Sequence, residues 1–276
     1  MEEENKIVGT SQKKSFGEKL KDFFSPREWI RTLRSVPGMV LALITVANIL
    51  MNVLANKSII QLSFPNGKDY WLIQDAGVVL SWVGFLAGDL LVRNFGARHA
   101  IRVNLTALLI SLFVSALLAL VGVIPGTWSP EFNYEDAVIA AEVGKSIDAV
   151  MGNVWYVIIG SAVASACGLI INNLTQDFIL RKIEKKHGDR YWGYLVAGGA
   201  STIVGQILDN FVFAALVSVN FFGWSWLTAL MCSIDGAVFE LVIEMCFTPL
   251  SYRISKNWDK NHIGVKWMDE SSIIKR

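Results

Sequence analysis

The stretch VNLTALLISLFVSALLALVGVIPGTWSP, residues 103–130, contains no Asp, Glu, Lys or Arg. A helix needs about 20 predominantly apolar residues to cross the ~30 Å hydrocarbon core of a membrane. Four further windows also lack charged residues, namely 35–56, 149–176, 191–208 and 210–234. A soluble chain of 276 residues cannot bury so many long uncharged stretches. The sequence therefore indicates an integral membrane protein.

The composition supports this interpretation. Hydrophobic residues make up 53% of the chain and charged residues only 18%, whereas soluble domains carry about 25% charge. The formal net charge is +1, so the chain has no overall positive field that would attract phosphate groups. Nucleic acid is therefore excluded as an expected partner.

The apolar windows predict an all-α fold, a bundle of six transmembrane helices. Alternation with a period of two residues is missing, which argues against a transmembrane barrel, and a helix satisfies its own backbone in lipid. The expected spans are residues 36–56, 71–92, 101–124, 153–180, 195–222 and 226–252. We expect a segment 1–35 with an interfacial amphipathic helix interrupted at Ser25-Pro26, a transmembrane domain 36–252, and a tail 253–276.

The basic residues predict the orientation. All of the 25 Lys and Arg residues except Lys57, Lys68 and Lys145 fall on one side of the expected spans. Basic loops stay in the cytoplasm, so both termini are expected there, and the 125–152 loop is expected outside. This arrangement fits a multi-pass protein of the bacterial inner membrane.

Asp209 is the strongest candidate functional residue because it falls near the middle of the fifth span. Gln206 and Asn210 lie close to it on the same helix. A carboxylate near the membrane centre costs roughly 2.5–3.5 kcal/mol on insertion scales, so it is a functional candidate by default. A hydrogen-bonded clamp between helices is the alternative, but a clamp rarely needs a carboxylate, so we favour a polar cavity.

A similar polar cluster occurs in the fourth span. NNLTQDFIL (172–180) aligns with GQILDNFVF (205–213), which places Asn173 on Gln206 and Gln176 on Asp209. Successive spans run in opposite directions, so the match is a short inverted repeat, and such repeats place a binding site near the midplane. Chance similarity between apolar helices is the alternative.

Further polar residues lie in the other spans. Asn48 lies in the first span, and Asp89 in the second stands four residues before Arg93, a spacing that suits either an ion pair or a functional carboxylate. Gln74 and Asp75 are expected near the outer end of the same span. In the sixth span Glu240 and Glu244 share a helix face, whereas Asp235 points elsewhere. Buried carboxyl groups can carry protons, so the candidates for proton coupling are Asp209, Glu240 and Glu244.

The sequence contains no catalytic constellation. The three histidines fall in expected cytoplasmic segments, and no HExxH, GxSxG or Walker-type phosphate loop occurs. The three cysteines fall inside spans and are interpreted as packing residues. We therefore expect no enzyme activity, no catalytic residue, no metal site and no cofactor.

Several motifs together resemble a known family. DLLVRNFGARHAIR (89–102) resembles the D-L-[ST]-x-[RE]-x-[FY]-G-x-x-x-A-[RK] signature of the putative vitamin uptake family, also called queuosine precursor transporters. STIVGQILDNFVF (201–213) resembles its S-x-x-x-x-[QN]-x-x-D-[ST]-x-x-F motif. Asn48 in ANIL and TPLSY (248–252) resemble parts of its first and last spans. The resemblance runs from about residue 40 to 255.

The resemblance implies a six-helix architecture like that of the substrate-binding subunits of energy-coupling-factor importers. It also implies import of a 7-deazaguanine precursor of queuosine. Asp209 would accept the N–H groups of the heterocycle, Gln206 and Asn173 would orient its ring, and Asn48 would add a contact. The implied partners are a small-molecule substrate, the lipid bilayer, and either a separate ATPase module or a second copy of the chain.

The chain departs from the family pattern in spans four to six. Asn173 and Gln176 stand where the family reads Q-x-x-D, Asn210 follows Asp209 in place of Thr or Ser, and Glu244 is additional. These differences leave the ligand open, so a carrier of another vitamin or nucleobase is the first alternative. A membrane enzyme or a scaffold is a more distant one.

Overall fold

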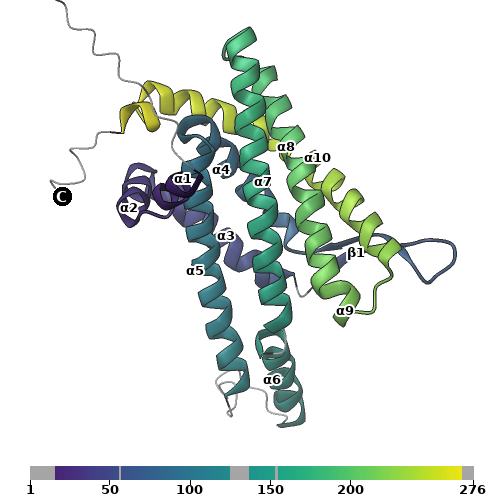
Figure 1. Ribbon diagram of the computed structural model, residues 1–276. Helices are drawn as coiled ribbons and strands as arrows, with labels where there is room; N and C mark the ends of the chain where they lie inside the picture. The colour runs from purple at the N-terminus through teal and green to yellow at the C-terminus, as the bar shows by residue number, and fades with distance from the viewer. Residues whose placement is uncertain (1–15, 56, 125–136, 153–154, 269–276) are drawn as a thin grey trace, which may run out of the picture.

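The computed structural model describes residues 16–55, 57–124, 137–152 and 155–268 (Figure 1). Its helices form an elongated bundle, and one short two-stranded hairpin lies beside it. The expected span ends at Asn56 and Asn153 fall outside the described residues, as do residues 1–15 and 269–276.

The N-terminal segment forms two short helices, α1 (Phe16–Phe23) and α2 (Pro26–Ser35), and the chain breaks between them at Ser25-Pro26 as predicted. α3 (Gly38–Leu54) follows at an angle of 102° to α2. Val36 is extended and precedes Pro37, and a residue before proline is disfavoured in the helical conformation. The sequence Val36-Pro37 therefore separates α2 from α3, so that the two helices point in different directions.

Among the described residues, five helices are each long and apolar enough to cross a membrane, and the total is six if the bent pair α2–α3 counts as one span. These five elements are α4 (Val78–Phe95), α5 (Ala97–Val123), α7 (Trp155–His187), α8 (Tyr191–Phe213) and α10 (Trp226–Lys260). α8 continues through η2 (Ala214–Ser218) and α9 (Val219–Phe221). The prediction of an all-α membrane protein is confirmed at this level.

The predicted start of the second span is wrong. Residues 71–75 belong to strand β2 (Tyr70–Asp75), which pairs antiparallel with β1 (Ser58–Ser63), and α4 begins only at Val78. The strands are rich in β-branched and aromatic residues, which favour the extended conformation. The turn contains Asn66-Gly67, with Gly67 at φ 65°, a conformation that glycine adopts without strain. Gln74 and Asp75 thus lie on a hairpin, not in a span.

The expected loop 125–152 is helical in its second half, where α6 (Ala137–Gly152) packs against α5. Large apolar side chains on the outer face of α5 are exposed, among them Leu109, Phe113 and Leu120. Exposed apolar side chains along a helix of this length are those that lipid would cover. The buried core between α4 and α5 contains Leu90, Leu91, Phe95 and Val103.

α8 packs against both α7 and α10, and α10 also packs against α4 and β2. The hairpin lies near α9, at the opposite end of α10 from α1 and α2 (Figure 1). α10 contains Pro249 and continues to Lys260. Proline bends a helix interior, and the end of α10 extends to the upper left in Figure 1, on the side of α1 and α2.

Candidate functional site

α7 and α8 cross with almost no space between their backbones. A Cβ atom added to Gly168 would lie 2.6 Å from Cβ of Asp209 and 2.8 Å from the carbonyl oxygen of Gly205. Reciprocally, a Cβ atom added to Gly205 would lie 2.6 Å from Cβ of Asn172. Gly168 therefore lies opposite Asp209, and Asn172 lies opposite Gly205. This pairing differs from the sequence alignment of the two spans, which places Gln176 on Asp209.

Asp209 is positioned by this crossing. The glycine at 168 lets α7 approach the base of the Asp209 side chain, and Ser165, one turn away on α7, donates a hydrogen bond to its carboxylate. Asn172 Oδ1 is buried nearby on α7 and has no hydrogen-bond partner, and Asn173 Nδ2 is likewise buried and unpartnered. Unpaired buried polar atoms cost about 1–3 kcal/mol each, so this turn of α7 is suited to receive a polar ligand.

Asn210 points toward α10 and the hairpin. Its Nδ2 lies 3.5 Å from the carbonyl oxygen of Ser233, and a Cβ atom at Gly236 would lie 3.0 Å from Asn210 Nδ2 and 3.1 Å from Gln74 Nε2. The glycine at 236 thus leaves room for two amides from separate elements. The hairpin contributes Gln74 to the bundle interior even though it is not part of a span.

Asp89 lies in a second group, on the other side of the interior. Its Oδ1 accepts a hydrogen bond of 2.7 Å from Gln176 Nε2, and its Oδ2 is buried without a partner. Glu244 from α10 faces the same space, next to Thr202 of α8. Neither carboxylate oxygen of Glu244 makes a hydrogen bond of good geometry.

The buried polar residues described so far form two groups, which include some but not all of the predicted site residues. The Asp209 group consists of Asp209, Ser165, Asn172 and Asn173, and the acid pair consists of Asp89 and Glu244. Asp209 and Gly198, which the acid pair contacts, are eleven positions apart on α8, or about 16 Å along a helix. One small heterocycle cannot contact both groups directly.

Glu240 stands between the two groups. It is one turn from Glu244 on α10, and its charge interacts with Asp209, Asp75 and Glu244. Asp235 instead lines a surface hollow of about 380 Å³ with Trp71 and Met231. The predicted shared face of Glu240 and Glu244, with Asp235 elsewhere, is confirmed.

Asn48 is partly buried on α3, which packs against α4 and α5. Asn52, one turn further along, donates to Ser111 and accepts from Ser161 of α7. Because α3 and α7 run in opposite directions, Asn48 lies at the depth of Ser165, which contacts Asp209. Gln206 is partly buried on α8, one turn before Asp209.

Sequence reasoning missed Ser165, Thr202 and the inward direction of Gln74. Serine and threonine occur in many membrane helices as ordinary packing residues, so their identity alone carried little signal. The one available sign was their spacing, since Ser165 and Thr202 each lie within a few residues of a polar cluster.

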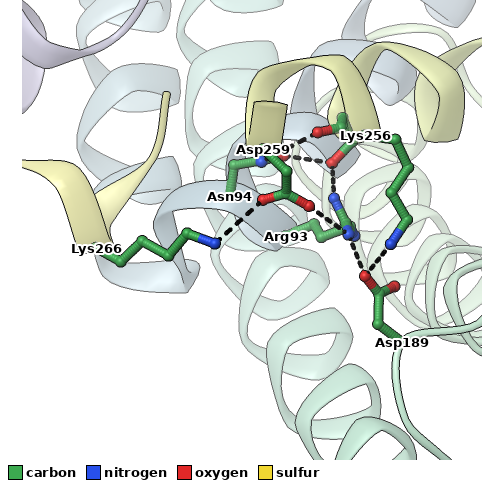
Figure 2. Close-up of polar contacts among 7 residues, drawn as sticks. Arg93, Asn94, Asp189, Lys256, Asp259 and Lys266 are labelled. Atoms are coloured by element: carbon green, nitrogen blue, oxygen red, sulfur yellow. Dashed lines mark hydrogen bonds and ion pairs between the residues drawn. The ribbon is translucent and has the colours of Figure 1, made fainter. Parts of the chain in front are cut away.

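The candidate ion pair between Asp89 and Arg93 is replaced by a different network. Figure 2 shows Arg93 at the end of α4, where it donates to Asp189 at 2.6 Å, to Asp259 at 3.0 Å and to Ser255. Lys256 also pairs with Asp189. Burial acts to raise the pKa of Asp189, but the hydrogen bond from Lys256 and the Arg93 charge together hold that pKa below its ordinary value.

This network joins three elements at one end of the bundle. Asp189 lies between α7 and α8, Arg93 on α4, and Asp259 on α10. The Arg93 side chain is only 5% exposed, and it lies one helical turn beyond Asp89 on α4. At the other end, burial raises the pKa of Asp75, which the backbone N–H of Gly77 partly offsets.

Long apolar helices around a buried set of carboxyl and amide groups define a polytopic membrane protein with a polar interior. Within the described ranges, no three His, Cys, Asp or Glu side chains are placed to hold a metal ion together. The family model described as "Putative vitamin uptake transporter" matches residues 75–254, well over half of the chain. The chain belongs to this family of membrane transporters, a role consistent with the lack of enzyme activity expected from its sequence.

The family match begins at Asp75 on the hairpin and ends shortly after Pro249 in α10. It thus includes α4, α5, α7, α8 and most of α10, which carry Asp89, Asn172, Asn173, Gln176, Asp209, Glu240 and Glu244. No curated protein matches the chain, and no solved structure matches it.

Proposed function

We propose that the chain imports a small planar heterocycle, and that the preferred substrate is a 7-deazaguanine precursor of queuosine. The observation that carries this proposal is the pair of unpartnered buried amide atoms, Asn172 Oδ1 and Asn173 Nδ2, about one helical turn along α7 from Gly168, which packs against Asp209. These atoms supply both donor and acceptor groups within one turn of a helix. A flat ring with donors on one edge and a carbonyl on another would satisfy them.

The chemistry assigns a role to each residue. A carboxylate can accept the two adjacent N–H groups of a guanine-like edge, so Asp209 would bind that edge. Asn173 and Gln206 would donate to the ring carbonyl, and Asn210 would face the ring from the hairpin side. Asn48 and Gln176 would border the site from α3 and from the next turn of α7.

The direction of transport follows from the proposed orientation. With both termini in the cytoplasm, the Arg93 network lies at the cytoplasmic end, and the hairpin lies at the outer end. Substrate would then reach Asp209 from the side of Gln74. The bacterial inner membrane, an architecture like that of energy-coupling-factor subunits, and assembly with an ATPase module or a second copy belong to the same proposal.

Uptake of a labelled 7-deazaguanine into cells that lack their own importer tests the function. Cells that produce the wild-type chain should accumulate the label. Asp209→Ala and Asn173→Ala should reduce uptake at least tenfold, whereas Asp235→Asn, an acid on another face, should not. A wild-type rate in Asp209→Ala would overturn the site assignment.

The alternative function is a carrier of another vitamin or nucleobase. This alternative stays open because Gln176 and Glu244 depart from the family pattern. Thermal-shift measurements on the purified protein, with deazaguanines, nucleobases and B vitamins as ligands, distinguish the two. A selective shift with a deazaguanine that is lost in Asp209→Asn supports the first. A selective shift with another compound supports the second.

A further inference from the structure

Two buried carboxyl groups from different helices converge over Gly198 of α8. A Cβ atom at this position would lie 2.8 Å from Glu244 Oε1 and 3.2 Å from Asp89 Oδ2. Glu244 is 2% exposed and Asp89 is 5% exposed. The two oxygens therefore lie at most 6.0 Å apart (2.8 Å plus 3.2 Å), beside the space that the missing side chain at 198 leaves open.

The hydrogen bonds around the acid pair leave its oxygens poorly satisfied. Gln176 donates to Asp89 Oδ1, and the Thr202 hydroxyl lies next to Glu244, whereas Asp89 Oδ2 has no hydrogen-bond partner and neither oxygen of Glu244 makes a hydrogen bond of good geometry. Two buried carboxylates this close repel each other when both are charged. One proton between them turns one carboxyl into a donor and the other into its acceptor, which satisfies both.

The groups that face the pair come from four helices. α7 contributes Gln176 and α8 contributes Thr202 and Tyr194, while Glu240 is the next acid on α10. The nearest basic residue on α4 is Arg93, one turn away, and it is held by Asp189 and Asp259. A carboxyl pair without its own cation is suited to carry a proton.

Access to the pair differs between its two sides. Toward the hairpin, Glu240 interacts with Glu244, with Asp209 and with Asp75, so acids continue in that direction. Toward the other end, the fully buried Tyr194 bonds to Ser251, and the Arg93 network lies beyond it. Acids therefore lie on both sides of the pair, but those at the Arg93 end, Asp189 and Asp259, are held in ion pairs with Arg93.

We infer that Asp89 and Glu244 share one transferable proton, and that this acid pair couples import to the proton gradient. The inference rests on the proposed import function and moves Asp89 from the substrate contacts to the coupling site. The proton enters past Asp75 and Glu240, forms an O–H bond within the pair, and leaves that bond toward the cytoplasm when the Arg93 network opens. The stoichiometry is one proton for each cycle.

Purified protein in liposomes tests the coupling, with a labelled 7-deazaguanine as the probe and an acidic outer buffer as the driving force. Wild-type vesicles should accumulate the label, and a protonophore should abolish accumulation. Glu244→Gln should lose gradient-driven accumulation at least tenfold while it still exchanges internal for external label. Glu244→Asp should partly restore accumulation, and Asp235→Asn, the matched acid on α10, should behave as wild type.

A second measurement needs no substrate. Infrared spectroscopy of the purified protein should detect the carbonyl stretch of a protonated carboxyl group at neutral pH, and this band should be lost in Glu244→Gln and in Asp89→Asn but kept in Asp235→Asn. A band that is unchanged in both variants overturns the shared proton.

The two experiments separate the coupling from the function. If wild-type vesicles take up the label equally with and without the pH gradient, or if uptake follows a sodium gradient, the proton coupling is overturned. The import function then still stands. The infrared band without any deazaguanine transport supports the shared proton and overturns the substrate.

Discussion

Gly168→Ala tests whether the contact between α7 and α8 builds the Asp209 group. The added methyl group would lie 2.6 Å from Cβ of Asp209 and 2.8 Å from the carbonyl oxygen of Gly205. Carbon atoms prefer about 3.5–4.0 Å, so the two helices must separate by roughly 1 Å at this point. The clash involves backbone atoms, which no change of rotamer can relieve.

The magnitude follows from two opposing effects. Overpacking a tight contact costs about 1–3 kcal/mol, whereas replacing glycine by alanine inside a helix gains roughly 0.5–1 kcal/mol. Gly88 on α4 is the matched control, because a Cβ atom there meets nothing within 4 Å. Gly88→Ala should therefore keep or raise stability, and Gly168→Ala should fall below it by about 1–3 kcal/mol.

Thermal unfolding of both variants in detergent, together with uptake of the labelled heterocycle, provides the assay. Gly168→Ala should unfold at a lower temperature than Gly88→Ala and should transport poorly, because Asp209 moves away from Ser165. If the two variants have equal stability and equal uptake, the close crossing does not position Asp209, and the reasoning is refuted.

Three further predictions follow from contacts outside the Asp209 group. Arg102→Ala removes hydrogen bonds to the carbonyl oxygens of Asp22 and Phe23 and to the Thr32 hydroxyl. It should lower the free energy of unfolding by about 1.5–3 kcal/mol and make α1–α2 accessible to protease. Arg98 is exposed, so Arg98→Ala should change that free energy by less than about 0.5 kcal/mol. The pKa of Asp189 is below its unfolded value of 3.8, so the Asp189 carboxylate stabilises the fold fully above pH 3.8 and progressively less as the pH falls below it. The difference in melting temperature between wild type and Asp189→Asn should therefore shrink below pH 3.8. A difference that stays constant with pH would contradict the ion pair. A membrane-impermeant thiol reagent on intact cells should label Lys68→Cys but not Lys260→Cys, in a background without Cys167, Cys232 and Cys246; the reverse pattern would invert the proposed orientation.

The helices could be predicted from the sequence because lipid imposes one simple requirement, a long uncharged window. That rule failed at residues 71–75, where an apolar strand follows directly into α4 and hydropathy alone cannot distinguish the two. The hairpin signal was the Asn66-Gly67 turn between two β-rich segments. The bend at Val36-Pro37 was likewise visible as a proline before an apolar helix.

The candidate site was predictable as a set of residue types and not as an arrangement. Asp209, Glu240 and Glu244 stood out because each is a carboxyl group in an apolar window. Which of them meet depends on helix crossings, and those are fixed by Gly168, Gly198 and Gly205, whose role is to lack a side chain. A glycine in a membrane helix is common, so the sequence could not show that Asp89 faces Glu244 while Asp209 faces Ser165.

Transport by the purified protein tests the central claim most directly, because no other cellular carrier is present. Liposomes that contain the wild-type chain should take up a labelled 7-deazaguanine, excess unlabelled compound should compete, and Asp209→Ala should reduce uptake to the level of empty vesicles while Asp235→Asn does not. Wild-type vesicles that take up no more label than empty ones, or equal uptake by the Asp209→Ala protein, would contradict the account.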